Sequence, residues 1–203
     1  VSHWANCLAL GLPVLIAIAL LTPRILDAHF GLFDDPKSVT IAEQICAGTW
    51  DWRADFGQYG RFRPVYWLSF SLLYGLAGGQ PVWQFVANLV LLAGTAFLLS
   101  SIVLRLTRRP LAAGITGVAL VLGGPAIEAT YTLSKPELLQ CFLLTASGAV
   151  LVLPRRDTSR SVRAGRVLLA ACFILLAALT KETTGLVLAI ASGWLLIAWL
   201  GKR

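Results

Sequence analysis

The chain has 203 residues, of which 57% are hydrophobic and 13% are charged, and its mean hydropathy is +0.76. Soluble domains carry roughly 25% charged residues, so this chain has too few polar groups to cover a water-exposed surface. The composition excludes a soluble globular enzyme, a disordered tail and a collagen-like fibre, and it predicts an all-α, multi-pass membrane protein. In that class, the net charge of +7 is a property of membrane-flanking loops and not a sign of nucleic-acid binding.

Charge-free stretches mark the expected membrane spans, since a crossing helix needs about 20 apolar residues. The first stretch has no basic region before it and no small-residue cleavage site after it, so we interpret it as an anchor and not as a signal peptide. The stretch from 64 to 104 is too long for one span, and the turn-forming sequence YGLAGGQP at 74–81 divides it. The predicted spans fall within 1–23, 81–104, 111–127, 138–154, 167–180 and 183–201.

Residues 64–78 allow two topologies. If they lie in the membrane interface, the chain has six spans, a cytoplasmic N-terminus and an outer loop at 24–80, with ten Lys and Arg residues inside and seven outside. If they cross, there are seven spans and all but two of the basic residues are cytoplasmic, which the positive-inside rule favours. We adopt the six-span arrangement because 64–78 is short and polar for a crossing and because segment 24–63 holds more acids than bases.

In the six-span arrangement, nine of the ten acidic residues lie on the outer side. The short segments 125–137 and 181–184 then line the same outer face as the long loop. A functional site on this face would draw its residues from three separate parts of the chain.

The first candidate element is the acid pair Asp34 and Asp35 in the sequence FDDPKS. Asp35 followed by Pro36 is typical of a helix start, and Gly48 is a plausible helix end, so we expect a short surface helix between them. One carboxylate is enough to cap a helix. The second, Asp34, is the better candidate for a general base, since a neighbouring like charge raises its proton affinity.

Cationic side chains supply the other candidates. Arg61 and Arg63 precede an aromatic-rich segment that begins at Pro64, at the depth of lipid head groups, and arginine binds phosphate bidentately. Lys135 lies in SKPELL, and Lys181 with Glu182 lies in LTKET. Each can equally be a flanking anchor of a membrane helix, and Ser134 with Glu137 fits a capping box.

These elements, in this order, resemble integral-membrane glycosyltransferases of the GT-C class. The resemblance is to the protein O-mannosyltransferase and aminoarabinose-transferase branch, and it rests on FDD, then RFRPVYWLSFSLLYGLAGGQPVWQFVANLVLL, then SKPELL and LTKET. It extends over nearly the whole chain. It departs from the family at Lys135, where arginine is frequent, and in having six spans where the family has eight or more.

The resemblance implies a single membrane module, residues 1–203, that is the N-terminal part of a longer fold in the cell membrane. Such an enzyme moves a sugar from a polyprenyl-phosphate donor to an acceptor hydroxyl on the extracytoplasmic side. One residue of the pair Asp34 and Asp35 would be the catalytic base. The donor phosphate would contact Arg61 or Arg63, with Lys135 and Lys181 as further candidates and Glu182 in support.

No cofactor other than the lipid-linked sugar substrate is indicated, because the sequence has no metal-ligand spacing, although a divalent metal remains compatible with the pattern. Two alternatives stay open. One is a fragment of a transporter or lipid flippase, which would have inverted repeats and polar residues in mid-span. The other is a non-catalytic membrane scaffold, in which all the candidate residues are caps and anchors.

Overall fold

The computed structural model describes residues 3–31, 35–51, 53, 63–133, 135–153, 159–185 and 188. All regular secondary structure in these residues is helical, which confirms the all-α prediction. Three helices are long and apolar enough to cross a membrane, namely α1 (His3–Leu26), α5 (Pro81–Thr107) and α9 (Arg160–Thr180). The two apolar helices α6 (Pro110–Val121) and α8 (Glu137–Val152) are shorter.

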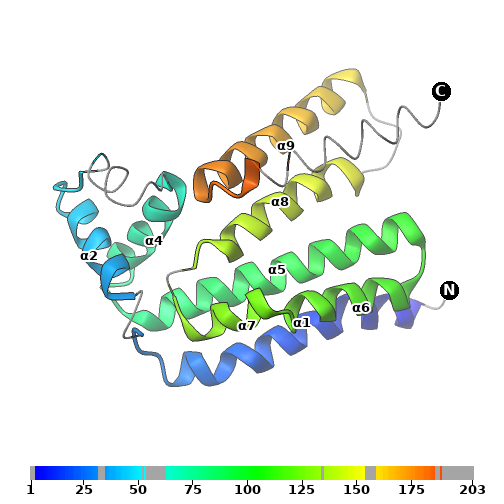
Figure 1. The fold of residues 1–203 in the computed structure, drawn as a ribbon. Coiled ribbons are helices and arrows are strands. Elements are labelled where there is room, and N and C mark those ends of the chain that lie inside the picture. The colour runs from blue at the N-terminus through cyan, green and yellow to red at the C-terminus, as the bar shows by residue number, and fades with distance from the viewer. Residues whose placement is uncertain are drawn as a thin grey trace.

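Helices α1, α5 and α6 form one tightly packed group, with α5 antiparallel to α1 (Figure 1). Small residues make the close approach possible, because Ala17, Ala96 and Ala113 are completely buried. Gly117 of α6 lies directly against Pro13 of α1, and an added Cβ there would come within 2.6 Å of the proline ring. Small side chains at helix crossings are characteristic of membrane-helix packing.

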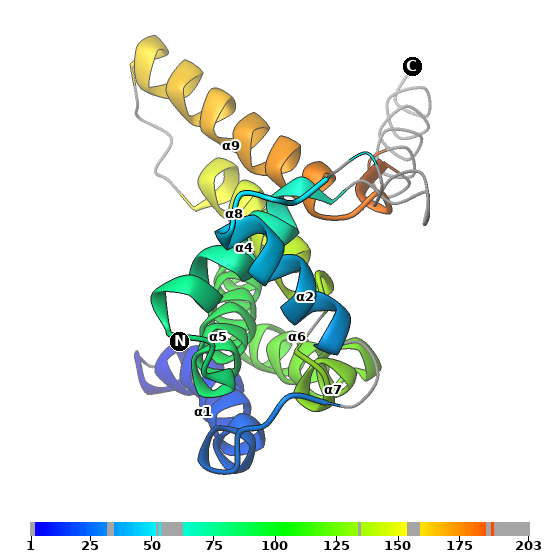
Figure 2. The same ribbon diagram turned by 90° about the vertical axis from the view of Figure 1, so that its left-hand side faces the viewer.

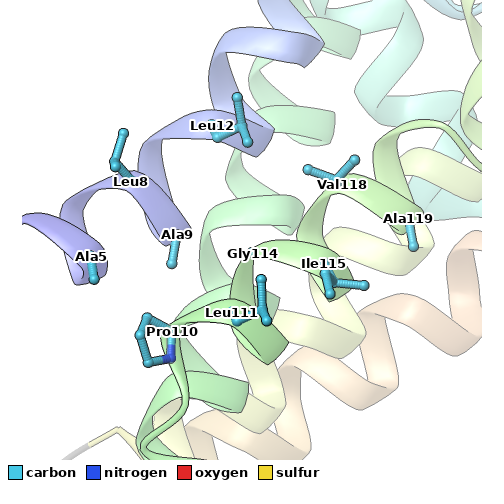
Figure 3. Close-up of a pocket in the computed structure, with 10 residues that line it drawn as sticks. All are labelled: Ala5, Leu8, Ala9, Leu12, Pro110, Leu111, Gly114, Ile115, Val118 and Ala119. Atoms are coloured by element: carbon cyan, nitrogen blue, oxygen red, sulfur yellow. The ribbon is translucent and has the colours of Figure 1, made fainter. Parts of the chain in front are cut away.

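Helices α8 and α9 pack beside this group and not around it (Figure 2). After α6, the short helix α7 (Gly124–Tyr131) continues toward the end of the molecule where α5 begins, and α8 and α9 then pack as an antiparallel pair on the other side of α5. The exterior is apolar in the manner expected of a lipid-facing surface, since Leu8, Ile115 and Leu168 are largely exposed. Between α1 and α6 lies a groove of about 550 Å³ lined by ten residues without a charged side chain (Figure 3).

Helices α2 (Asp35–Cys46) and α4 (Pro64–Leu76) pack against each other at one end of this bundle (Figure 1). Tyr74 of α4 donates a hydrogen bond to Glu43 of α2 (3.2 Å), and Gln84 at the start of α5 donates to the Phe70 carbonyl of α4 (3.1 Å). Helix α4 therefore begins and ends at the same end of the bundle as α5 begins. The interfacial placement of 64–78 and the count of six spans stay predictions, because three described helices have the length to cross a membrane.

Charge is divided between the two ends. One end, here called the α2–α4 end, contains α2, α4, α7 and the turn after α9, and every Asp and Glu that the structure describes lies there. The opposite end, here called the arginine end, carries only basic charges among its described residues. Its members are Arg105, Arg108, Arg109, Arg160, Arg163 and Arg166.

Candidate functional site

Three segments far apart in the sequence meet at the α2–α4 end. The backbone N–H of Leu133 donates to the Asp35 carboxylate, Arg63 pairs with Glu182, and Lys181 pairs with Glu137. These contacts join the loop around α2, the segment before α8 and the turn after α9. The expectation that 125–137 and 181–184 share a face with the first loop is therefore met.

Asp35 is a buried carboxylate with 1% of its surface exposed. Its Oδ2 accepts from the Gly31 N–H at 2.6 Å, and its Oδ1 accepts from the Leu133 N–H at 3.0 Å. Each carboxylate oxygen therefore accepts a hydrogen bond from a backbone N–H group, one from Gly31 and one from Leu133. Asp35 fastens the start of α2 to the segment that leads into α8, and its oxygens do not face solvent.

Arg63 lies just before α4 and forms a two-point ion pair with Glu182. Its Nε and Nη2 donate to the two carboxylate oxygens, each at 3.3 Å. The Arg63 side chain is 12% exposed and that of Glu182 is 49% exposed. The parallel arrangement of two N–H groups is the geometry with which arginine also grips a phosphate.

Two lysines complete the set of cations. Lys181 forms an ion pair with Glu137 at the start of α8, and Lys135 forms one with Glu128 of α7 at 2.8 Å. The second oxygen of Glu137, Oε2, is buried and has no hydrogen-bond partner. Because Lys181 and Glu182 are adjacent in sequence but pair with different elements, this dipeptide ties α9 to both α8 and the start of α4.

The turn that carries Lys181 and Glu182 is held in place by Gln140 of α8. Its side-chain amide donates to the hydroxyls of Thr183 (3.0 Å) and Thr184 (2.6 Å), both in that turn. The Thr184 hydroxyl in turn donates to the Ala177 carbonyl at 2.9 Å. Gln140 and Thr184 are buried, so the position of the turn is fixed by polar contacts inside the protein.

Tyr66 of α4 is buried at this end, near enough to Asp35, Arg63 and Glu137 for their charges to act on its hydroxyl. It is buried between aromatic neighbours of α4, with Trp67 4.8 Å away between ring centroids. Burial raises the pKa of the phenol above its ordinary value, and the nearby carboxylates raise it further. The Tyr66 hydroxyl is therefore neutral at physiological pH and can act as a hydrogen-bond donor.

Five of the seven residues predicted from the sequence are described, and they lie together at this end. They are Asp35, Arg63, Lys135, Lys181 and Glu182, whereas Asp34 and Arg61 lie outside the described residues. All three described cations of this set are paired with carboxylates.

Four further residues at the α2–α4 end were not predicted as site residues from the sequence, namely Tyr66, Glu128, Glu137 and Gln140. Glu137 was interpreted as part of a capping box, but α8 begins at Glu137 with Pro136 before it, and the carboxylate pairs with Lys181. The sequence signal available for it was only that an acid and a base each border an apolar stretch on the outer side. That pattern does not say which base an acid will contact.

No group of three potential metal ligands is found in the part of the chain that the structure describes. The chemistry offered by this end is therefore that of carboxylates, cations and a neutral phenol at the boundary of an apolar bundle. No family model, curated protein or solved structure matches the chain.

Proposed function

We propose that this chain is a module of a GT-C-type membrane glycosyltransferase with six spans and a cytoplasmic N-terminus. It moves a sugar from a polyprenyl-phosphate donor to an acceptor hydroxyl on the extracytoplasmic side. One observation carries the proposal: partly buried cations and carboxylates from separate segments converge at a single end of an apolar helical bundle. A lipid-linked phosphate presents its charge at this depth while its chain stays in the bilayer.

Arg63 and Lys181 bind the donor phosphate. Only 12% of the Arg63 side chain and 18% of the Lys181 side chain are exposed, so both cations are already largely removed from water. In the ligand-free state, Glu182 and Glu137 neutralise them and keep them oriented. A phosphate carries the same acceptor geometry as a carboxylate with an additional oxygen, and it replaces these partners when the donor enters. Positive charge at that point also stabilises the departing phosphate in the transition state.

Asp34 is the base that takes the proton of the acceptor hydroxyl, and Asp35 positions it. We assign the role of base to Asp34 because Asp35 is buried and both of its carboxylate oxygens already accept hydrogen bonds from backbone N–H groups. A general base must instead reach the acceptor hydroxyl within hydrogen-bond distance. Asp35 itself is fixed between Gly31 and Leu133, which ties the start of α2 to the segment that leads to Lys135.

The orientation is supported by the arginine end, where the described residues carry only basic charge. Under the positive-inside rule this end is cytoplasmic, and the α2–α4 end is extracytoplasmic. A cysteine placed by Asp34→Cys in a variant without the four native cysteines should react with a membrane-impermeant thiol reagent added outside intact cells. Reaction only after the membrane is permeabilised would refute the orientation.

Donor binding tests the phosphate site. The full chain in neutral detergent is titrated with polyprenyl phosphate, and Arg63→Gln is compared with Arg163→Gln at the arginine end. Loss of a charge-assisted hydrogen bond of about 1.5–3 kcal/mol should weaken binding by about tenfold or more in Arg63→Gln. Arg163→Gln should stay within twofold of the unmodified chain. Equal affinities for Arg63→Gln and the unmodified chain would refute the role of Arg63.

A second candidate function is a non-catalytic membrane scaffold. It is favoured by one specific observation, that each cation predicted to bind phosphate and described by the structure is paired with a carboxylate. In a scaffold these pairs are permanent ties between helices. Polyprenyl phosphate would then bind no more tightly than a neutral polyprenol, and removing Arg63 would change stability but not lipid affinity.

A further inference from the structure

A second polar feature lies at the arginine end, away from the site discussed above. A shallow, open cavity of about 330 Å³ lies between α1, the last turns of α5 and the end of α8, and its two arginines are exposed. Its polar lining consists of Ser101, Arg105 and Arg108, and its apolar lining of Leu10, Leu104 and Leu153. The volume is within the range of small-ligand sites, about 300–1,000 Å³.

The two arginines of this cavity have no acidic partner among the described residues. Among the residues that the structure describes, neither forms an ion pair, whereas Arg63, Lys135 and Lys181 at the other end all do. The described residues of the arginine end contain no Asp or Glu that could neutralise them. In the described part of the chain, the cavity therefore presents positive charge beside leucine side chains, with no carboxylate at the same end.

Arg108 occupies this position at a conformational cost. It is the residue that ends α5, and its φ of 57° lies in the left-handed region, the only such value for a non-glycine residue in the described chain. Helices that end in this conformation usually have glycine or asparagine there, because other side chains lose roughly 1 kcal/mol or more. Strained residues that persist in a structure often serve a ligand.

We propose that this cavity binds the phosphate head group of an anionic phospholipid. Arg105 and Arg108 hold the phosphate, and the Ser101 hydroxyl, which donates to the Phe97 carbonyl at 2.7 Å, offers a lone pair to a glycerol hydroxyl of the head group. The leucines cover the first carbons of the acyl chains. A phospholipid fits better than a soluble anion because three of the six lining residues are leucines and the cavity lies at the end of α5, a helix long and apolar enough to cross a membrane.

The test measures the affinity of the full chain in neutral detergent for phosphatidylglycerol and for phosphatidylcholine at 0.15 M salt. The variants are Arg105→Gln, Arg108→Asn and the double variant. Asparagine tolerates the left-handed conformation, so Arg108→Asn keeps the end of α5 intact while removing the charge. Arg163→Gln is the matched control, because it removes one arginine from the same end but outside the cavity.

We expect tighter binding of phosphatidylglycerol than of phosphatidylcholine. An interaction of about 1 kcal/mol per arginine corresponds to a loss of about fivefold for each single variant and about 25-fold for the double variant. The control should change by less than twofold, since charges beyond about 8 Å are screened at this salt concentration. If the double variant does not fold, the Arg108→Asn result decides.

Three results would overturn the proposal. Equal affinity for the two lipids would show that the cavity does not recognise the anionic head group. An equal loss in Arg163→Gln and Arg105→Gln would show diffuse surface attraction in place of a site. Displacement of phosphatidylglycerol by millimolar inorganic phosphate would identify a soluble anion as the ligand. None of these results would affect the glycosyltransferase proposal, because that proposal rests on the other end of the molecule.

Discussion

Removing the Asp35 carboxylate should destabilise the protein by several kcal/mol. Asp35 accepts two backbone hydrogen bonds, from Gly31 and Leu133, and Leu133 is itself only 3% exposed. A hydrogen bond to a charged group contributes about 1.5–3 kcal/mol, so Asp35→Ala should lose about 3–6 kcal/mol. Asp35→Asn keeps one acceptor oxygen and turns an amide N–H toward the other donor, so its loss should be about 2–4 kcal/mol.

The assay is the free energy of unfolding from a denaturing-detergent titration in mixed micelles. Asp51→Asn is the matched control, because Asp51 is exposed and accepts only a local bond from the Arg53 N–H at 2.9 Å. Its loss should stay below about 1 kcal/mol. If the free energy of unfolding of Asp35→Ala lies within about 1 kcal/mol of that of the unmodified chain, Asp35 does not stabilise the contact between the start of α2 and the segment before α8. If Asp35→Asn is fully stable but loses sugar transfer, Asp35 and not Asp34 is the base.

Three further predictions concern packing, the turn after α9 and pH. Gly117→Ala should cost about 1–3 kcal/mol of unfolding free energy because its Cβ would collide with Pro13, whereas Gly11→Ala, where nothing lies within 4 Å, should not destabilise; equal stabilities would refute the close crossing of α1 and α6. Gln140→Ala should lose about 1–3 kcal/mol because the buried Thr184 hydroxyl and the neighbouring Thr183 hydroxyl lose their donor, and a neutral result in the same titration would contradict the anchored turn. Because burial raises the Tyr66 pKa, the unfolded chain loses this proton first as pH rises above about 10, so stability should fall there and Tyr66→Phe should reduce that fall; identical pH profiles would count against a buried neutral phenol.

The all-helical class and the gathering of the described acids at one end could be predicted from the sequence, because hydrophobic length and charge are local properties. The predicted span 111–127 is instead divided between α6 and α7, and three of the described helices are long enough to cross a membrane. The start of α2 at Asp35 and the turn at Gly48, whose φ is +70°, follow local rules in the same way. Helix α4 begins at Pro64 as expected, and its placement in the membrane interface stays a prediction.

The partners of the polar residues could not be predicted. Arg63 and Glu182 are 119 positions apart, and Asp35 and Leu133 are 98 apart, so their contacts depend on how complete helices pack. The same limitation explains why Asp35 was grouped with Asp34 as a catalytic candidate. Its sequence neighbours predict a helix start, but only the packed structure buries it against Leu133.

The central claim is that this chain transfers sugar from a polyprenyl-phosphate donor with Asp34 as base. The most direct measurement is the release of polyprenyl phosphate from a panel of polyprenyl-phosphate sugars by proteoliposomes that contain the full chain or its Asp34→Asn variant. The account predicts release from at least one donor, and a rate about 100-fold or more lower in Asp34→Asn, the contribution expected of a general base. Release from no donor, or equal rates for the two proteins, would contradict it.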